Sequence, residues 1–128
     1  MKRLLFSASL LSLVLTAAHA DQFAYIRPET ARKAVELLAK EREVYFFCEP
    51  CNESTGQLAK IDKLEAVDVN YEGFHEVQIN GQGIDLAYTY VMRKGRWKNA
   101  AIELGLKPTG VSAEIPPIKP SRPQPSAY

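Results

Sequence analysis

The middle of the chain, from Leu64 to Met92, alternates inward-facing and polar side chains with a period of two. This is the pattern of β-strands that bury one face, and it limits the fold more than any other feature. Two turn signals divide it: Glu72-Gly73, and Asn80-Gly81, a pair that readily adopts the positive φ of a tight hairpin. The pattern predicts an antiparallel meander of three strands, at about residues 64–72, 74–79 and 84–92. The residues expected to face inward are Val67, Val69, Tyr71, His75, Val77, Ile79, Ile84, Leu86, Tyr88, Tyr90 and Met92.

Helical spacing flanks the meander on both sides. Pro28 suits the first turn of a helix, because its missing N–H would have no partner there. We expect one helix over about residues 28–42 and a second from Trp97 to Leu104, with Gly105 as its C-cap. The apolar positions that carry this spacing are Ala31, Ala34, Val35 and Leu38, and then Trp97, Ala100, Ala101 and Leu104.

Residues 44–47, Val-Tyr-Phe-Phe, are apolar on both parities, which predicts a strand covered on both faces. Together these elements predict a small single α+β domain. We expect an antiparallel meander sheet of about four strands, with the N-terminal and the C-terminal helix packed on one face.

The first twenty residues have the organisation of a signal peptide. A basic start, Lys2-Arg3, precedes an apolar stretch to about Ala17, and Ala18-His19-Ala20 has the small-x-small pattern of a cleavage site. The stretch is shorter than the ~20 apolar residues of a membrane span. We therefore expect a signal peptide over residues 1–20, cleavage after Ala20 and no membrane span. The exported protein is predicted to be periplasmic or secreted.

After the signal peptide we expect one α+β domain over residues 21–107 and a proline-rich, flexible tail over residues 108–128. Six of the eight prolines lie in the tail, which lacks an apolar period. Within it, residues 111–115 are expected to form a short docked piece. Without the signal peptide the chain has 14 basic and 15 acidic residues, and this net charge of −1 gives no general attraction to nucleic acid.

Cys48 and Cys51 are the only cysteines of the chain. In an oxidising export compartment we expect a disulfide, whose four-residue ring would contribute about 2 kcal/mol and fix one turn. A rigid turn would present Glu49 and Pro50, the first candidate interaction residues, with little loss of entropy on binding. An enzyme inhibitor or immunity-type protein that inserts this loop into a partner is a further alternative.

Thiol chemistry is the main alternative. An apolar strand followed by Cys48-Glu49-Pro50-Cys51 resembles the redox site of thioredoxin-like proteins, and the resemblance implies disulfide exchange with Cys48 as the attacking thiol. Residues 21–47 are too few for the parallel strands and crossover helix that precede this motif in that fold, and Glu49 disfavours a thiolate. Two thiolates also suit copper(I), whereas a structural zinc needs four ligands. The disulfide interpretation predicts no metal site and no cofactor.

Residues 93–98, Arg-Lys-Gly-Arg-Trp-Lys, surround one tryptophan with four cations. An aromatic between basic residues is compatible with nucleic acid, but the export signal favours an anionic envelope component or an unknown protein as partner. The alternative is a solvated turn beside a helix that buries Trp97. The further candidate interaction residues are Arg93, Lys94, Arg96 and Lys98.

His75 is the only histidine outside the signal peptide and the one candidate general base. Glu76, its neighbour, points to the opposite strand face, so we expect His75 at the margin of the core and no catalytic residue. The parity of Tyr88 and Tyr90 predicts that both belong to the core. The sequence thus predicts an exported, non-catalytic binding or accessory protein. The alternatives are thiol–disulfide exchange, copper(I) handling and enzyme inhibition.

Overall fold

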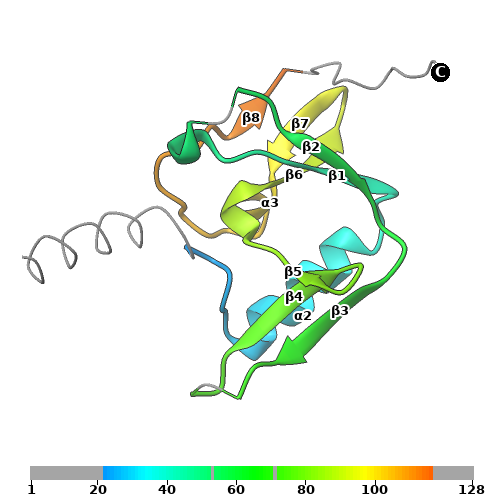
Figure 1. Ribbon diagram of the computed structural model, residues 1–128, viewed down its shortest axis with the longest axis vertical. Helices are drawn as coiled ribbons and strands as arrows, with labels where there is room; N and C mark the ends of the chain where they lie inside the picture. Colours follow the sequence, from blue (N-terminus) through cyan, green and yellow to red (C-terminus); the bar gives the residue numbers. More distant parts are fainter. Residues whose placement is uncertain (1–21, 53, 71, 117–128) are drawn as a thin grey trace, which may run out of the picture.

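The computed structural model describes residues 22–52, 54–70 and 72–116, and in them the chain forms two antiparallel β-sheets with two α-helices (Figure 1). The expected signal peptide and the tail from residue 117 lie outside these residues. The elements are α2 (Pro28–Leu38), β1 (Glu43–Phe46), η1 (Glu49–Cys51), β2 (Gln57–Lys60), β3 (Leu64–Asp68), β4 (His75–Ile79), β5 (Gln82–Gly83), η2 (Leu86–Tyr88), β6 (Thr89–Arg93), β7 (Arg96–Asn99), α3 (Ala100–Glu103) and β8 (Glu114–Ile115).

The α+β class is as predicted, but the single sheet of about four strands is wrong. One sheet has five strands in the order β2-β1-β6-β7-β8, and the other has three in the order β3-β4-β5. The expected strand over 84–92 is a strand only from Thr89 onward, because η2 occupies Leu86–Tyr88. The short strand β5, which precedes it, pairs with β4, whereas β6 joins β1 in the other sheet. This break in the expected strand follows from Asp85, which caps η2: its Oδ1 accepts a hydrogen bond from Ala87 N at 2.9 Å, and its carbonyl accepts one from Thr89 Oγ1 at 2.8 Å.

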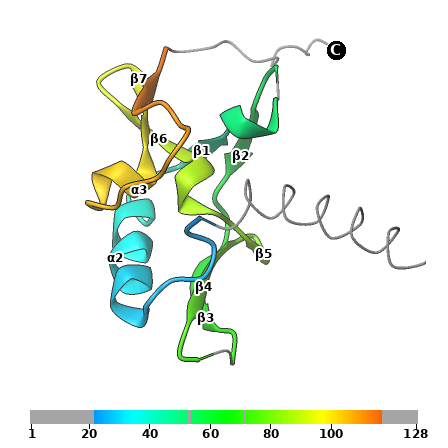
Figure 2. The same cartoon turned by 90° about the vertical axis from the view of Figure 1, so that its left-hand side faces the viewer.

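Helix α2 covers one face of the three-stranded sheet (Figure 2). Its expected apolar face is confirmed, since Ala31, Ala34 and Leu38 are buried. The helix ends at Leu38 rather than at residue 42. The helix stops early because the chain turns at Glu41, whose N–H donates to Leu38 O at 3.0 Å. The next residue, Arg42, already continues the pairing of β1 with β2, since its carbonyl accepts from Ile61 N at 2.9 Å.

Two tight hairpins shape the sheets. Asn80-Gly81 (φ 54° and 84°) joins β4 to β5, as predicted. Lys94-Gly95 has nearly the same dihedrals (φ 53° and 79°) and joins β6 to β7. The expected second helix is therefore wrong over its first part, because Trp97 lies in strand β7.

Helix α3 begins only at Ala100. Asn99 caps it by accepting a hydrogen bond from Ile102 N at 3.1 Å, while the buried Asn99 amide donates to Ala87 O at 2.9 Å. Gly105 follows the helix with φ 83°, as its predicted C-cap role requires.

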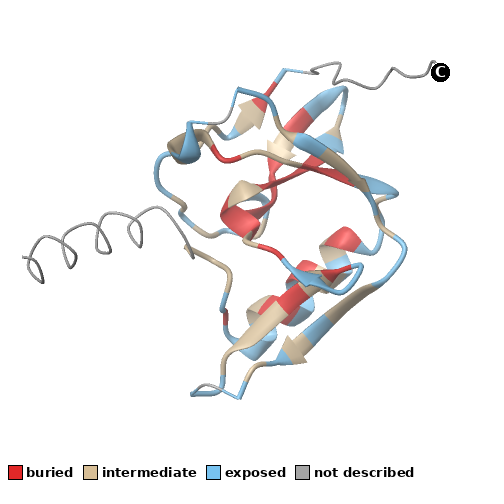
Figure 3. Cartoon of the chain, in the orientation of Figure 1, coloured by how far each residue is buried: buried red, intermediate tan, exposed pale blue. Residues whose placement is uncertain are grey.

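The buried residues form two clusters, one on either face of β1. They gather on α2, β4, α3, β1 and β6 (Figure 3). The prediction for β1 is confirmed, because Val44 belongs to an aliphatic cluster and Tyr45 to an aromatic one, and both are fully buried. The aromatic cluster consists of Tyr45, Tyr90, Trp97 and Ile115. The aliphatic cluster consists of Ile26, Ala31, Ala34, Leu38, Val44, Val77, Ile79, Ile84, Leu86, Val91, Ala100 and Ala101.

The segment after Pro108 supplies the last strand. Strand β8 pairs with β7 through Trp97 and Ile115, and Asn99 N donates to Ala113 O at 2.8 Å. This is the docked piece expected over residues 111–115. Among the residues that the structure describes, no helix combines the length and the apolar character that crossing a membrane requires.

Candidate functional site

Cys48 and Cys51 form a disulfide, with their Cα atoms 5.3 Å apart. The loop between them is the single turn η1, in which Cys51 N donates to Cys48 O at 3.2 Å and Asn52 N donates to Glu49 O at 3.1 Å. Asn52 then leaves the turn in the left-handed region (φ 63°). Cys48 is buried and Cys51 is exposed. The predicted disulfide-fixed turn is thus present, and Cys51 is the exposed one of its two cysteines.

The side chains of this turn are anchored to the chain before β8. The Glu49 carboxylate accepts two hydrogen bonds from Ser112, one from its N–H and one from its Oγ at 2.9 Å. Pro50 lies against Gly110, where an added Cβ would be 3.4 Å from the proline ring. Both candidate interaction residues are half-buried, and the Glu49 carboxylate is engaged within the molecule.

The basic residues of the β6–β7 hairpin also have partners within the molecule. Arg93 pairs with Glu41 at 2.8 Å and with Glu103 at 3.5 Å. Glu114 pairs with the other two paired cations, Arg96 at 2.9 Å and Lys98 at 3.0 Å. Among the described residues, Lys94 alone of the four candidates has no ion pair.

The environment of Glu114 follows from these pairs. The hydrogen bond from Lys98, together with the positive charges of Lys98 and Arg96, holds the pKa of its carboxyl below the ordinary value. Trp97, which lies between Arg96 and Lys98 in the sequence of β7, is buried on the other face of the strand and stacks on Tyr45, with ring centroids 5.4 Å apart. The hairpin is therefore a folded, charge-balanced element rather than an open cationic surface.

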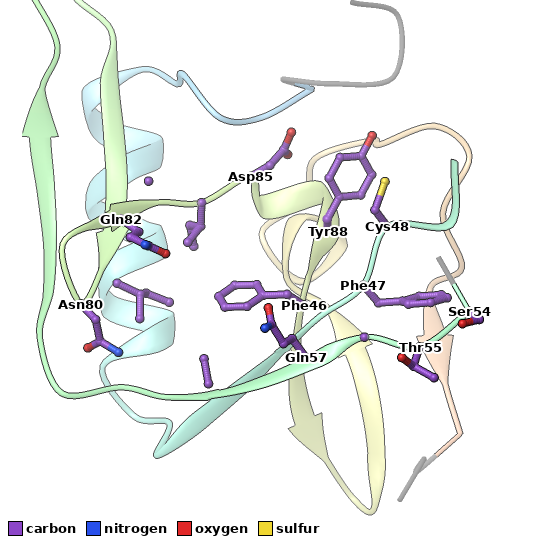
Figure 4. Close-up of a pocket in the computed structure, with 15 residues that line it drawn as sticks. Phe46, Phe47, Cys48, Ser54, Thr55, Gln57, Asn80, Gln82, Asp85 and Tyr88 are labelled. Carbon is purple, nitrogen blue, oxygen red and sulfur yellow. The ribbon is translucent and has the colours of Figure 1, made fainter. Parts of the chain in front are cut away.

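A cleft of about 700 Å³ opens between the two sheets (Figure 4). We call it the intersheet cleft. Its lining combines the end of β1, the disulfide loop, strand β2 and the segment from β4 to η2. The lining residues are Phe46, Phe47, Cys48, Ser54, Thr55, Gly56, Gln57, Ala59, Ile79, Asn80, Gln82, Gly83, Ile84, Asp85 and Tyr88. Of the residues predicted as site residues, only Cys48 is among them.

Some polar groups of the intersheet cleft hold the structure together. Asn80 is a latch between the sheets: its Oδ1 accepts from Asp62 N and Lys63 N, both at 2.9 Å, and its Nδ2 donates to Lys60 O at 2.8 Å. Asp85 Oδ1 accepts from two backbone amides, Phe23 N at 3.0 Å and Ala87 N at 2.9 Å.

Other polar groups of the cleft remain available. Gln57 and Gln82 are exposed, and neither side chain has a hydrogen bond within the part of the chain that the structure describes. Ser54 and Thr55 are likewise exposed at the end of the cleft near Phe47 (Figure 4). The cleft thus offers donors and acceptors at several points along apolar walls.

His75 lies away from the intersheet cleft. It is half-buried on the same face of β4 as Val77 and Ile79, as expected, and its backbone bridges to Ile26. Its buried Nδ1 has no hydrogen-bond partner among the described residues. Nor do residues 22–116, with 53 and 71 left aside, bring three or more His, Cys, Asp or Glu side chains together in a metal-binding arrangement.

The two tyrosines of the predicted core differ. Tyr90 is fully buried, whereas Tyr88 is half-buried and lines the cleft. Burial raises the pKa of the Tyr90 phenol, and the nearby charge of Glu49 raises it further, although a hydrogen bond with Asn99 acts in the opposite direction.

Comparison with known proteins identifies no relative. A scan against protein-family models and searches of curated proteins and of solved structures found no match to this chain. Among the features of the described residues, the intersheet cleft is the one that combines an open volume with aromatic and hydrogen-bonding side chains.

Proposed function

We propose that the chain is an exported, non-catalytic binding protein whose working surface is the intersheet cleft. The observation that carries this proposal is the cleft itself, about 700 Å³ in volume and lined by both aromatic and hydrogen-bonding side chains. Ligand sites of proteins have volumes of about 300–1,000 Å³ and combine apolar walls with a few polar groups. Export is supported by the signal-peptide pattern of residues 1–20.

The disulfide loop has a supporting role in this proposal. Cys48 lines the cleft, and the loop that follows it is fixed twice, by the bond to Cys51 and by the hydrogen bonds between Glu49 and Ser112. A wall that is rigid before binding loses little conformational entropy when a ligand arrives. The basic hairpin supports an anionic partner less well, because three of its four cations are paired with glutamates.

Thiol–disulfide exchange is the second candidate, and the exposure of Cys51 is the observation that favours it. The attacking thiol would then be Cys51 instead of the Cys48 expected from the sequence. Two features oppose it. Glu49 places a carboxylate in the same turn, and η1 ends after three residues at a left-handed Asn52, so no long helix begins at the pair to stabilise a thiolate.

The reduction potential of the pair separates these two candidates. A structural disulfide has a potential below about −300 mV, whereas exchange proteins lie at about −120 to −270 mV. We expect the lower value, measured on the oxidised exported chain with free thiols counted at each potential. A value in the upper range would favour exchange over binding.

Binding at the cleft is tested by thermal unfolding in the presence of neutral, anionic and cationic ligands. A ligand at a hundred times its Kd stabilises the folded state by about 2.7 kcal/mol. Gln57→Trp places a large ring in the cleft and should abolish the stabilisation. Lys60→Trp is the matched control, because Lys60 is exposed on the same strand but does not line the cleft. Stabilisation by no ligand class, or equal stabilisation of both variants, would contradict the proposal.

A further inference from the structure

The charge of the intersheet cleft limits the ligands that it can hold. Among the residues that the structure describes, those that line the cleft include no lysine, arginine or histidine. Asp85 brings a carboxylate to the lining, and Glu76 lies close by, since a Cβ on Gly83 would meet the Glu76 carboxylate. A phosphate or carboxylate in the cleft would meet no positive partner and would lose its hydration without compensation. The cleft therefore suits an uncharged ligand better than an anion.

The aromatic rings are arranged along the cleft instead of around one point. Phe46 is the last residue of β1 and Phe47 follows it, and their rings extend in opposite directions (Figure 4). Phe47 is held by stacking on Tyr45, with centroids 6.2 Å apart, and Phe46 packs on the aliphatic cluster. Such an arrangement does not form a cage for a single cation. It provides two fixed apolar surfaces for a ligand that extends from one to the other.

The hydrogen-bonding side chains that have no partner within the described residues are spread along the cleft in the same direction as the two phenylalanine rings. The Gln57 amide lies between the two phenylalanines, Gln82 lies toward one end, and Ser54 and Thr55 lie toward the other (Figure 4). Each amide offers both donors and an acceptor, and each hydroxyl offers one donor and two acceptor positions. Neutral groups of this kind match a ligand that carries many hydroxyls, because a hydroxyl both donates and accepts.

An extended peptide fits less well. A peptide usually adds to the open edge of a sheet through its backbone, and β2 is the edge strand beside the cleft. This strand of four residues is already engaged at and beside its ends: its last residue, Lys60, accepts from the Asn80 amide through its carbonyl, and Gly56, the residue before β2, donates from its N–H to the Tyr45 hydroxyl at 2.9 Å. Little of the edge remains for strand addition.

We infer that the intersheet cleft binds a neutral oligosaccharide, an inference that rests on the proposed binding function. The apolar C–H faces of successive sugar rings pack on Phe46 and Phe47, and their hydroxyls exchange hydrogen bonds with the amides of Gln57 and Gln82. The disulfide loop closes the side of the cleft next to Cys48.

Isothermal titration calorimetry of the oxidised exported chain tests this inference. The probes are three neutral tetrasaccharides (chitotetraose, cellotetraose and maltotetraose), the anionic tetragalacturonate and the peptide tetra-alanine. We expect saturable binding of at least one neutral tetrasaccharide and none of tetragalacturonate. Gln57→Ala and Gln82→Ala should each weaken that binding about tenfold, the equivalent of one or two lost hydrogen bonds.

Gln78→Ala is the matched control. Its amide lies on the adjacent strand β4, outside the cleft lining, and donates to Glu76 at 3.0 Å, so its removal should leave binding unchanged. Binding of tetra-alanine or tetragalacturonate in place of the neutral sugars would overturn the oligosaccharide inference and leave the proposed binding function intact. Binding by none of the probes, together with no stabilisation by any ligand class, would overturn both. Equal losses in Gln57→Ala and Gln78→Ala would place the sugar outside the cleft.

Discussion

The two sheets differ in how their strands are connected. In the three-stranded sheet every pairing joins strands that are consecutive in the sequence, β3 with β4 and β4 with β5. In the five-stranded sheet the central pairing joins β1 to β6, so that Tyr45 lies opposite Tyr90. The first half is held by aliphatic packing against α2, and the second contains the aromatic cluster around Tyr45 and Trp97.

This difference explains why the intersheet cleft lies where it does. Strands β2 and β3 follow each other along one continuous path from one sheet to the other (Figure 1). Asn80 closes the gap at one end by bonding to Lys60, Asp62 and Lys63. The two layers therefore meet through this latch and through the aliphatic cluster, which has members in both sheets, and the intersheet cleft opens beside them.

Two glycines of the cleft give the largest expected contrast between the halves. A Cβ on Gly56 would meet Phe46 O at 2.3 Å and the Tyr45 ring at 2.6 Å, whereas a Cβ on Gly83 would meet the end of the flexible Glu76 side chain. Overpacking of a core costs about 1–3 kcal/mol, and contact with a backbone oxygen and a buried ring puts Gly56→Ala at the upper end of that range, at about 3 kcal/mol. We expect Gly56→Ala to lose that much stability to urea unfolding and Gly83→Ala to lose under ~1 kcal/mol.

Equal losses in these two variants would show that the Glu76 side chain is as firmly held as the Tyr45 ring. In that case the three-stranded half would be no more tolerant than the five-stranded half, and the contrast between them would fail.

The Asn80 latch should have the next largest effect on the free energy of unfolding. Asn80→Ala removes three side-chain hydrogen bonds and places alanine at φ 54°. We expect a loss of about 2–3 kcal/mol. Asn80→Gly keeps the favoured backbone conformation and should lose only about 1–2 kcal/mol. The measurement is urea unfolding, with hydrogen exchange at Asp62 and Lys63 as the local readout.

If Asn80→Ala and Asn80→Gly were equally destabilised, the backbone conformation would contribute nothing. If Asn80→Gly matched the wild type and left exchange at Asp62 unchanged, the side chain would not be a latch, and the joint between the sheets would have to lie elsewhere.

The two halves also differ in what the sequence could predict. In the three-stranded half, the apolar face of α2 and the Asn80-Gly81 hairpin depend on residues close together in the chain, and both were predicted correctly. In the five-stranded half, Trp97 has helical spacing with Ala100 and Ala101, but Lys94-Gly95 turns the chain back so that Trp97 packs on Tyr45. No local pattern reveals that distant contact.

The candidate site shows the same difference between features that depend on neighbouring residues and features that depend on distant contacts. The disulfide was predictable from two cysteines in a chain that begins with a signal-peptide pattern, because their pairing is local. The cleft was not, because Phe46, Gln57 and Gln82 come together only through the pairing of β1 with β2 and the latch at Asn80. The inward bonds of Glu49 were equally hidden, since its partner Ser112 lies on a segment whose docking depends on β8.

The anchor of the disulfide loop should have a moderate effect. Glu49→Gln replaces the charged carboxylate, which accepts two hydrogen bonds from Ser112, by a neutral amide. We expect the free energy of unfolding, measured in urea, to fall by about 1 kcal/mol. Ser112→Ala removes one of the two donors. A double-mutant cycle with these variants isolates their coupling, which should be above ~0.5 kcal/mol. Additive losses would mean that the loop is held by its disulfide and by Pro50 packing alone.

The exposed pairs of Glu114 should have the smallest effect, and its dependence on pH has a definite sign. The hydrogen bond from Lys98 and the charges of Lys98 and Arg96 lower the pKa of the Glu114 carboxyl in the folded state below its ordinary value. Its contribution to stability is therefore present above the ordinary pKa and is lost as the pH falls through the folded pKa. Glu114→Gln should therefore be slightly less stable than the wild type at pH 7, and the two should converge in acid. Glu43→Gln is the control, because Glu43 is exposed on β1 and its side chain has no ion pair among the described residues. A difference that persists unchanged at low pH would show that Glu114 stabilises β8 by packing and not by its charge.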